Sequence, residues 1–135
     1  MREYSITASR TKERSSEARG RSVVIPLDTA RDARMDALCA AELLLASVGA
    51  AVLAAADDSA SAMSFSLEGA VVHVHGVHRS DFGHALTVDY DLTLDTDEPE
   101  HRMLQLHEHV WQSVNRIPLG QGAVQLTGRI RRGRV

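Results

Sequence analysis

Three stretches of the chain alternate between hydrophobic and polar residues, which is the pattern of β-strands with one buried face. The first two lie on either side of residues 79–83 and are expected to pair as a hairpin that turns there. The third covers residues 124–131 and predicts a last strand. The apolar positions of the three stretches are Val72 and Val74, then Leu86, Val88, Tyr90, Leu92 and Leu94, and then Val124, Leu126 and Ile130.

The alternation also extends toward the N-terminal side of the first hairpin strand. Met63, Phe65 and Leu67 alternate with polar residues, and after Gly69 the apolar residues continue on the opposite parity. A β-bulge inserts one extra residue and changes parity in this way. We therefore expect one strand that runs from Met63 onward, with a bulge at Gly69.

The N-terminal region predicts a hairpin or a small sheet. Tyr4, Ile6 and Ala8 alternate with polar residues, and β-branched residues return at Val23. Between them, residues 9–21 are polar and rich in arginine, and we expect them to form a connection.

An alanine- and leucine-rich stretch predicts a first helix from Asp36 to about Asp57. Two adjacent aspartates oppose the helix dipole at its C-terminal end, which favours a stop there. The stretch is apolar almost all round, so a sheet together with another helix or a second subunit has to cover it. Glu42 and the many alanines argue against a membrane span.

A second helix is predicted after Asp97, which is a candidate cap, with Pro99 in the first turn and Glu100 shortly after it. Apolar residues then recur at steps of three and four, which predicts a core-facing stripe. The stripe consists of Met103, Leu106, Val110, Val114 and Ile117, with Leu104 and Trp111 beside it.

Together these elements predict one α+β domain over residues 1–135, in the order β-β-α-β-β-α-β, with a curved and mainly antiparallel sheet. The hydrophobic content of 44% in 135 residues supports a modest core. The chain ends are basic and the middle is acidic, so we expect a homodimer held partly by charge pairing. No secretory signal is evident, which favours the cytoplasm. The terminal arginines lack interleaved aromatic residues, which argues against nucleic-acid binding.

Seven histidines raise the question of a metal site. His73 and His75 share one face of the predicted hairpin, opposite Thr87, Asp89 or Asp91. We favour a solvent-exposed sheet face with cross-strand pairs of polar and charged residues over a metal site, because no third ligand is fixed by the spacing. His107 falls within the apolar stripe, which predicts either a partly buried, hydrogen-bonded histidine or a dimer contact. Motifs for phosphate-bearing cofactors and for serine hydrolases are lacking, so no cofactor is expected.

Two segments of the chain carry a family resemblance: Ala40-Ala-Glu-Leu-Leu-Leu-Ala-Ser-Val-Gly-Ala-Ala51 in the predicted first helix and Val110-Trp-Gln-Ser-Val-Asn-Arg-Ile117 in the second. The first resembles the central helix of the OsmC/Ohr family, the osmotically inducible and organic hydroperoxide resistance proteins. The second is similar, more loosely, to another conserved segment of that family. The family's members are thiol-dependent peroxidases that act in the oxidative stress response. The resemblance therefore implies an origin in such enzymes, and an intertwined homodimer with the active site at the subunit interface.

The chain departs from the family where the chemistry would lie. The positions that match the peroxidatic and resolving cysteines hold Ala51 and Gln112, and neither side chain forms a thiolate. The resemblance also implies a glutamate that holds the thiolate together with a loop arginine. Its position is matched by Ala41, with Glu42 one residue on, and the candidate arginines are Arg10 and Arg14.

The sequence therefore predicts a homologue with a degenerate active site, which acts as a small-molecule binding protein or a structural remnant rather than a peroxidase. Its pocket is expected near Glu42, Ala51, Trp111 and Gln112, with a small apolar or acidic ligand. The alternative is a one-cysteine hydroperoxide reductase that uses Cys39, the only cysteine. A helix N-terminus lowers the pKa of a thiol, although a lone cysteine among alanines and leucines is more often inert packing.

Overall fold

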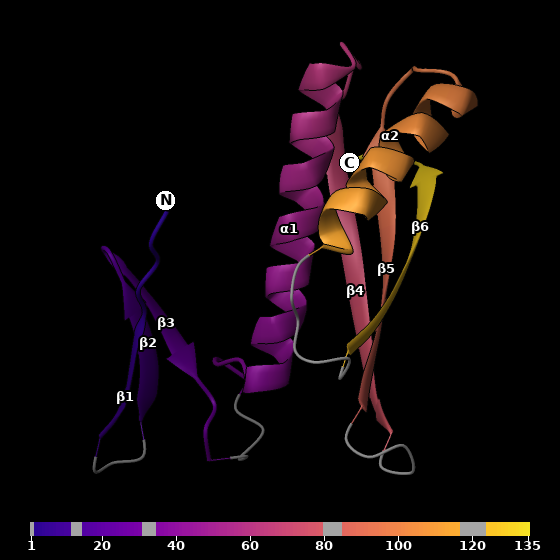
Figure 1. Cartoon of the computed structure of the whole chain (residues 1–135). Helices are drawn as coiled ribbons and strands as arrows, with labels where there is room; N and C mark the ends of the chain where they lie inside the picture. Colours follow the sequence, from indigo (N-terminus) through magenta and orange to yellow (C-terminus); the bar gives the residue numbers. More distant parts are fainter. Residues whose placement is uncertain (1, 12–14, 31–34, 80–84, 117–123) are drawn as a thin grey trace. The chain divides into compact units, whose positions relative to one another are not determined.

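The computed structural model describes residues 2–11, 15–30, 35–79, 85–116 and 124–135 (Figure 1). Its elements follow the order β-β-β-α-β-β-α-β. The chain divides into two compact units, residues 1–44 and residues 45–135, and each is described by itself. The α+β class is confirmed, with one strand more than the sequence predicts.

The N-terminal unit contains a three-stranded antiparallel sheet of β1 (Thr7–Arg10), β2 (Ser16–Gly20) and β3 (Val23–Leu27), in that order. The expectation that residues 9–21 form only a connection is wrong, because β2 lies within them. The residues of β2 are polar or small, so the strand has no apolar alternation to reveal it. Backbone pairing holds it in place instead: all five residues pair with β3, and Ser16 to Arg19 also pair with β1.

One face of this N-terminal sheet is apolar and open. The register aligns Ala8, Ala18 and Ile25 across the three strands, and side chains two residues apart on a strand share a face. Ile6 and Val23 therefore belong to the same face, where they are 67% and 50% exposed. A sheet with an uncovered apolar face gains stability when another surface covers it.

The first helix, α1 (Ala40–Ala62), continues beyond the stop expected at Asp57. It ends instead in a Schellman motif: Ser64 has a left-handed φ of 51°, and the Phe65 N–H donates to the Ala60 carbonyl at 2.8 Å. Phe65 and Ala60 are both buried, which supplies the apolar contact of this motif. Each exposed aspartate near the C-terminus of a helix costs about 0.3 to 1 kcal/mol through the helix dipole. This cost is small, so the cap decides where the helix ends.

The C-terminal unit contains a sheet of β4 (Gly69–Arg79), β5 (Ala85–Asp95) and β6 (Val124–Arg132). β4 and β5 are antiparallel, as the predicted hairpin requires, whereas β5 and β6 are parallel. The expected strand from Met63 to Leu67 with a bulge at Gly69 is wrong. Those residues form the turn that ends α1 and the loop that follows it.

Both helices pack on one face of this sheet, where they enclose the core. The alternation of β5 is confirmed, because its four apolar positions from Val88 onward are fully buried. The core consists of Val48, Val52, Ala55, Ala56 and Ala60 of α1, Phe65, the β5 residues Val88, Tyr90, Leu92 and Leu94, and the α2 residues Met103, Leu106, Val110 and Val114.

The second helix, α2 (Glu100–Val114), presents its predicted stripe to the core. Ile117, the last member of the predicted stripe, lies outside the described residues. The expected cap at Asp97 is wrong: the N-cap residue is Pro99, and no side chain caps the helix there.

α1 is long and apolar enough to cross a membrane by length and composition alone. Val48, Val52 and Ala56 are nonetheless buried in the core of the C-terminal unit, so we interpret α1 as a core helix. Ala50 and Ala54, on another side of α1, are exposed. Within the C-terminal unit, the sheet and α2 cover the side of α1 that carries Val48, Val52 and Ala56, in line with the expected cover by a sheet and another helix.

Candidate functional site

The two positions that match the family cysteines lie on different helices. Ala51 is half-buried within α1. Gln112 is exposed on α2, where its Nε2 donates a hydrogen bond to Glu108 Oε1 at 3.4 Å. Neither side chain can serve as a nucleophile.

Cys39 and Glu42 form the N-terminal cap of α1. Cys39 is half-buried and directly precedes the helix, and its backbone N–H donates to Glu42 Oε1 at 3.0 Å. This backbone hydrogen bond lowers the pKa of the Glu42 carboxyl below its usual value. A glutamate at the third helical position that reaches back to the N-cap residue is one half of a capping box. The Glu42 carboxylate is therefore engaged in capping the start of α1.

The candidate arginines are only partly described. Arg10 is exposed at the end of β1, opposite Ser16 of β2. Arg14 lies outside the described residues.

The histidines of β4 stand where the sequence places them, on the face of the sheet opposite the core. His73 is directly opposite Asp91, and His75 is directly opposite Asp89. Arg129 Nε lies 3.8 Å from Asp91 Oδ1, which extends this row onto β6. Among the described residues, no group of three or more His, Cys, Asp or Glu side chains has the geometry to hold a metal ion. Cross-strand polar pairing accounts for this face.

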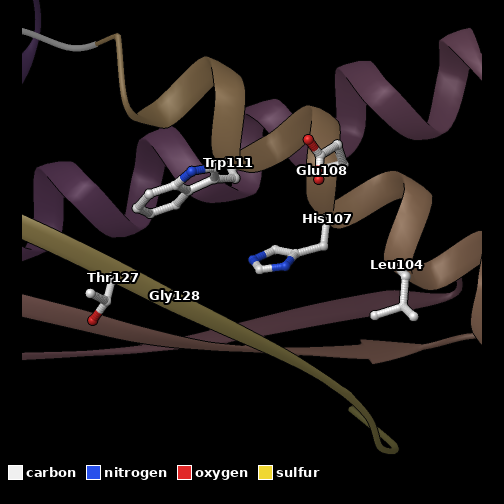
Figure 2. A pocket seen from close by; sticks show the side chains of 6 residues that line it. All are labelled: Leu104, His107, Glu108, Trp111, Thr127 and Gly128. Carbon is white, nitrogen blue, oxygen red and sulfur yellow. The ribbon is translucent and has the colours of Figure 1, made fainter.

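A pocket of about 440 Å³ lies between α2 and β6 (Figure 2). Helix α2 contributes Leu104, His107, Glu108 and Trp111, and β6 contributes Thr127 and Gly128. In Figure 2, the His107 and Trp111 side chains lie on the side of α2 that faces β6, whereas the Glu108 carboxylate points away from that strand. The pocket therefore has mainly apolar walls, one imidazole inside and one carboxylate at its rim.

A buried tyrosine contacts one of the residues that line this pocket, His107. Tyr90 is fully buried on β5, and its hydroxyl lies 2.8 Å from His107 Nε2. The two rings meet edge to face, with centroids 5.8 Å apart. Burial raises the pKa of Tyr90 to about 12. Burial also lowers the pKa of His107, opposed in part by the charge of Glu108. Both groups are therefore neutral at neutral pH.

Gly128 makes room for the tyrosine ring. It pairs directly with Tyr90 across β5 and β6, and a Cβ at this position would overlap the ring carbons and the hydroxyl oxygen. The glycine is needed here for space, since its φ is not left-handed. It allows the hydroxyl of a core residue to reach α2.

The α2–β6 pocket brings together one of the predicted pocket residues and five residues outside that set. Trp111 lines the α2–β6 pocket, whereas Glu42, Ala51 and Gln112 are not among its lining residues. The expectation that His107 is partly buried and hydrogen-bonded is confirmed. The alternation of the strand assigns its partner, Tyr90, only to the core. Tyr90 could have been singled out from the sequence, because it places a hydroxyl on the buried face of a strand and a buried tyrosine needs a polar partner.

We expect His107 to make stability depend on pH. A histidine whose pKa is lowered by folding contributes stability that is present above the unfolded pKa of about 6.5 and is lost as the pH falls through the folded value. The melting temperature of the native protein should therefore fall more steeply than that of His107→Gln as the pH drops below about 6.5. His109→Gln, which removes an exposed histidine of the same helix, is the control. Parallel curves for the native protein and His107→Gln would contradict this role.

The fold of the chain is that of OsmC-like proteins. An OsmC-like protein from Mycoplasma pneumoniae has a TM-score of 0.84 and 18% identity, and the match covers 97% of each chain. An organic hydroperoxide resistance protein from Elizabethkingia anophelis, with thiocyanate bound, has a TM-score of 0.73 and 14% identity over 98% of this chain and 99% of that one. An organic hydroperoxide resistance protein OsmC from Legionella pneumophila has a TM-score of 0.70 and 17% identity, over 96% of this chain and 97% of that one.

Comparison with protein-family models and with curated protein sequences found no match. The likeness is therefore one of structure over nearly the whole chain. It confirms the fold that the two sequence motifs predict.

Proposed function

We propose that this protein is a homodimeric, cytoplasmic OsmC-like protein that lacks thiol peroxidase chemistry and binds a small molecule. The observation that carries the proposal is the position of the only cysteine. Cys39 is the N-cap residue of α1, with its backbone tied to Glu42. The helix position that would hold the family's nucleophile is Ala51, so a hydroperoxide would meet a methyl group there.

The α2–β6 pocket supports the binding part of the proposal. Small-molecule sites are concave and mostly apolar, with a few polar groups that orient the ligand. Leu104 and Trp111 supply apolar surface, and His107 supplies a polar group held in place by Tyr90. The rim carboxylate of Glu108 favours the apolar ligand of the sequence prediction over the acidic one, because like charges repel.

The purified protein is expected to consume no organic hydroperoxide in the presence of a dithiol reductant. The same rate should be found for native protein and for Cys39→Ser, because no thiolate stands at the site. The measurement is the loss of cumene hydroperoxide over time, with a reductant-only blank. Turnover that disappears in Cys39→Ser would establish the alternative, a one-cysteine hydroperoxide reductase, and would overturn this proposal.

The open apolar face of the N-terminal sheet supports the homodimer. Ile6, Val23 and Ile25 are exposed there, as are Ala50 and Ala54 on α1. A second copy offers the same surfaces in return, which is how isologous interfaces form. Sedimentation velocity at micromolar protein should therefore give the mass of two chains.

A charge on the apolar face should weaken this assembly. Ile25→Asp is expected to shift the sedimenting species toward the monomer, because a buried unpaired carboxylate is costly at an interface. Val24→Asp is the matched control, since neighbouring strand residues point to opposite faces. A native protein that sediments as one chain would contradict the homodimer.

A further inference from the structure

The hydrogen bond between Tyr90 and His107 determines which ring nitrogen carries the proton. The Tyr90 hydroxyl is buried, and within the described part of the chain its hydrogen-bond partner is His107 Nε2. A buried hydroxyl hydrogen needs an acceptor. Nε2 is therefore the acceptor, and the neutral ring carries its hydrogen on Nδ1.

His107 Nδ1 is a donor without a partner among the residues that the structure describes. The His107 ring makes one hydrogen bond to the described residues, through Nε2. Among the described residues, every side-chain nitrogen or oxygen that is sealed from solvent has a hydrogen-bond partner. Nδ1 is therefore open to solvent. The half-buried ring lines the α2–β6 pocket, between the Leu104 and Trp111 side chains of the same helix (Figure 2).

We propose that the α2–β6 pocket binds a small, neutral aromatic molecule whose carbonyl oxygen accepts a hydrogen bond from His107 Nδ1. This assignment rests on the proposed small-molecule function and names its ligand class. The aromatic body packs on the Trp111 indole and on Leu104, as offset or edge-to-face rings do. A pocket of about 440 Å³ accommodates a ligand of one or two rings. The Glu108 carboxylate at the rim disfavours a ligand with a carboxylate of its own.

The test compares three ligands of similar size: acetophenone, ethylbenzene and benzoate. Acetophenone has the ring and the carbonyl, ethylbenzene has the ring without the oxygen, and benzoate adds a negative charge. Trp111 is the only tryptophan, so the protein labelled with ¹⁵N gives a single indole N–H signal that reports on this pocket. We expect acetophenone to shift this signal saturably, with a Kd about five-fold below that of ethylbenzene, since one net hydrogen bond is worth about that factor. Benzoate should bind most weakly.

Two variants separate the donor from the apolar surface. His107→Leu should bind acetophenone and ethylbenzene equally, whereas His109→Gln, on an exposed side of the same helix, should keep the native preference. The comparison of the three ligands on native protein needs no variant, so a His107→Leu chain that fails to fold leaves the test intact.

Equal binding of acetophenone and ethylbenzene to native protein would overturn the inference, as would tighter binding of benzoate or an indole signal that none of the three shifts. The proposed function fails by a different result, which is hydroperoxide turnover that depends on Cys39. The two failures are therefore distinguishable.

Discussion

A Gly128→Ala variant is expected to lose about 2 to 3 kcal/mol of its free energy of unfolding. The added Cβ would overlap the Tyr90 ring, which lies over Gly128 from the neighbouring strand. The ring cannot swing aside cheaply, because it is fully buried and its hydroxyl is bonded to His107. Urea unfolding of native and variant protein measures the loss.

The loss should depend on the tyrosine ring. In a Tyr90→Leu background, the same Gly128→Ala change should cost much less, since the overlapping atoms are gone. Gly49→Ala on α1 is the matched control: its Cβ would meet Val72 and Val74 at an ordinary 3.5 Å, and alanine favours the helix by about 1 kcal/mol over glycine. An equal cost of Gly128→Ala in both backgrounds would show that Tyr90 does not fill the space at Gly128.

Arg102→Met is expected to destabilise the protein by about 2 kcal/mol. The Arg102 guanidinium donates to the Met63 carbonyl at 2.9 Å, to the Ser64 carbonyl at 3.4 Å and to Glu98 Oε2 at 3.2 Å, and it lies over the Phe65 ring. It therefore ties the end of α1 to the first turn of α2. Methionine keeps the apolar stem but leaves the two carbonyls and the carboxylate without this donor.

Arg129→Met is the matched control for Arg102. Its side chain is 81% exposed and its ion pair with Asp91 spans 3.8 Å, so its loss should change the free energy of unfolding by less than about 0.5 kcal/mol. Chemical denaturation of both variants gives the comparison. Equal effects of the two substitutions would mean that Arg102 acts only as a surface charge.

The N-terminal half shows where local patterns fall short. β2 is absent from the sequence prediction because its polar residues are held by backbone pairing on both sides, and pairing of this kind leaves no trace in hydrophobic periodicity. The predicted end of α1 near Asp57 is wrong for a related reason. Asp57 and Asp58 are weak stop signals, whereas the Schellman motif at Ser64 depends on a backbone conformation that serine seldom signals.

The sequence by itself determined the β4–β5 hairpin, the last strand, the apolar stripe of α2 and the α+β class. Its periodicity of two in β5 and of three and four in α2 is imposed by burial of one face, which is a local property of each element. It also determined that Ala51 and Gln112, which the resemblance matches to the family's cysteines, cannot form a thiolate, because residue identity needs no coordinates.

Only the tertiary structure decided the candidate site. Tyr90 and His107 are 17 residues apart in the chain, and Gly128 comes from a third element. Their contact depends on the parallel β5–β6 pairing and on the rotation of α2 over the sheet. It also depends on the missing side chain of Gly128, which leaves room for the Tyr90 ring. None of these is a property of one segment, because each arises from how separate elements pack against one another.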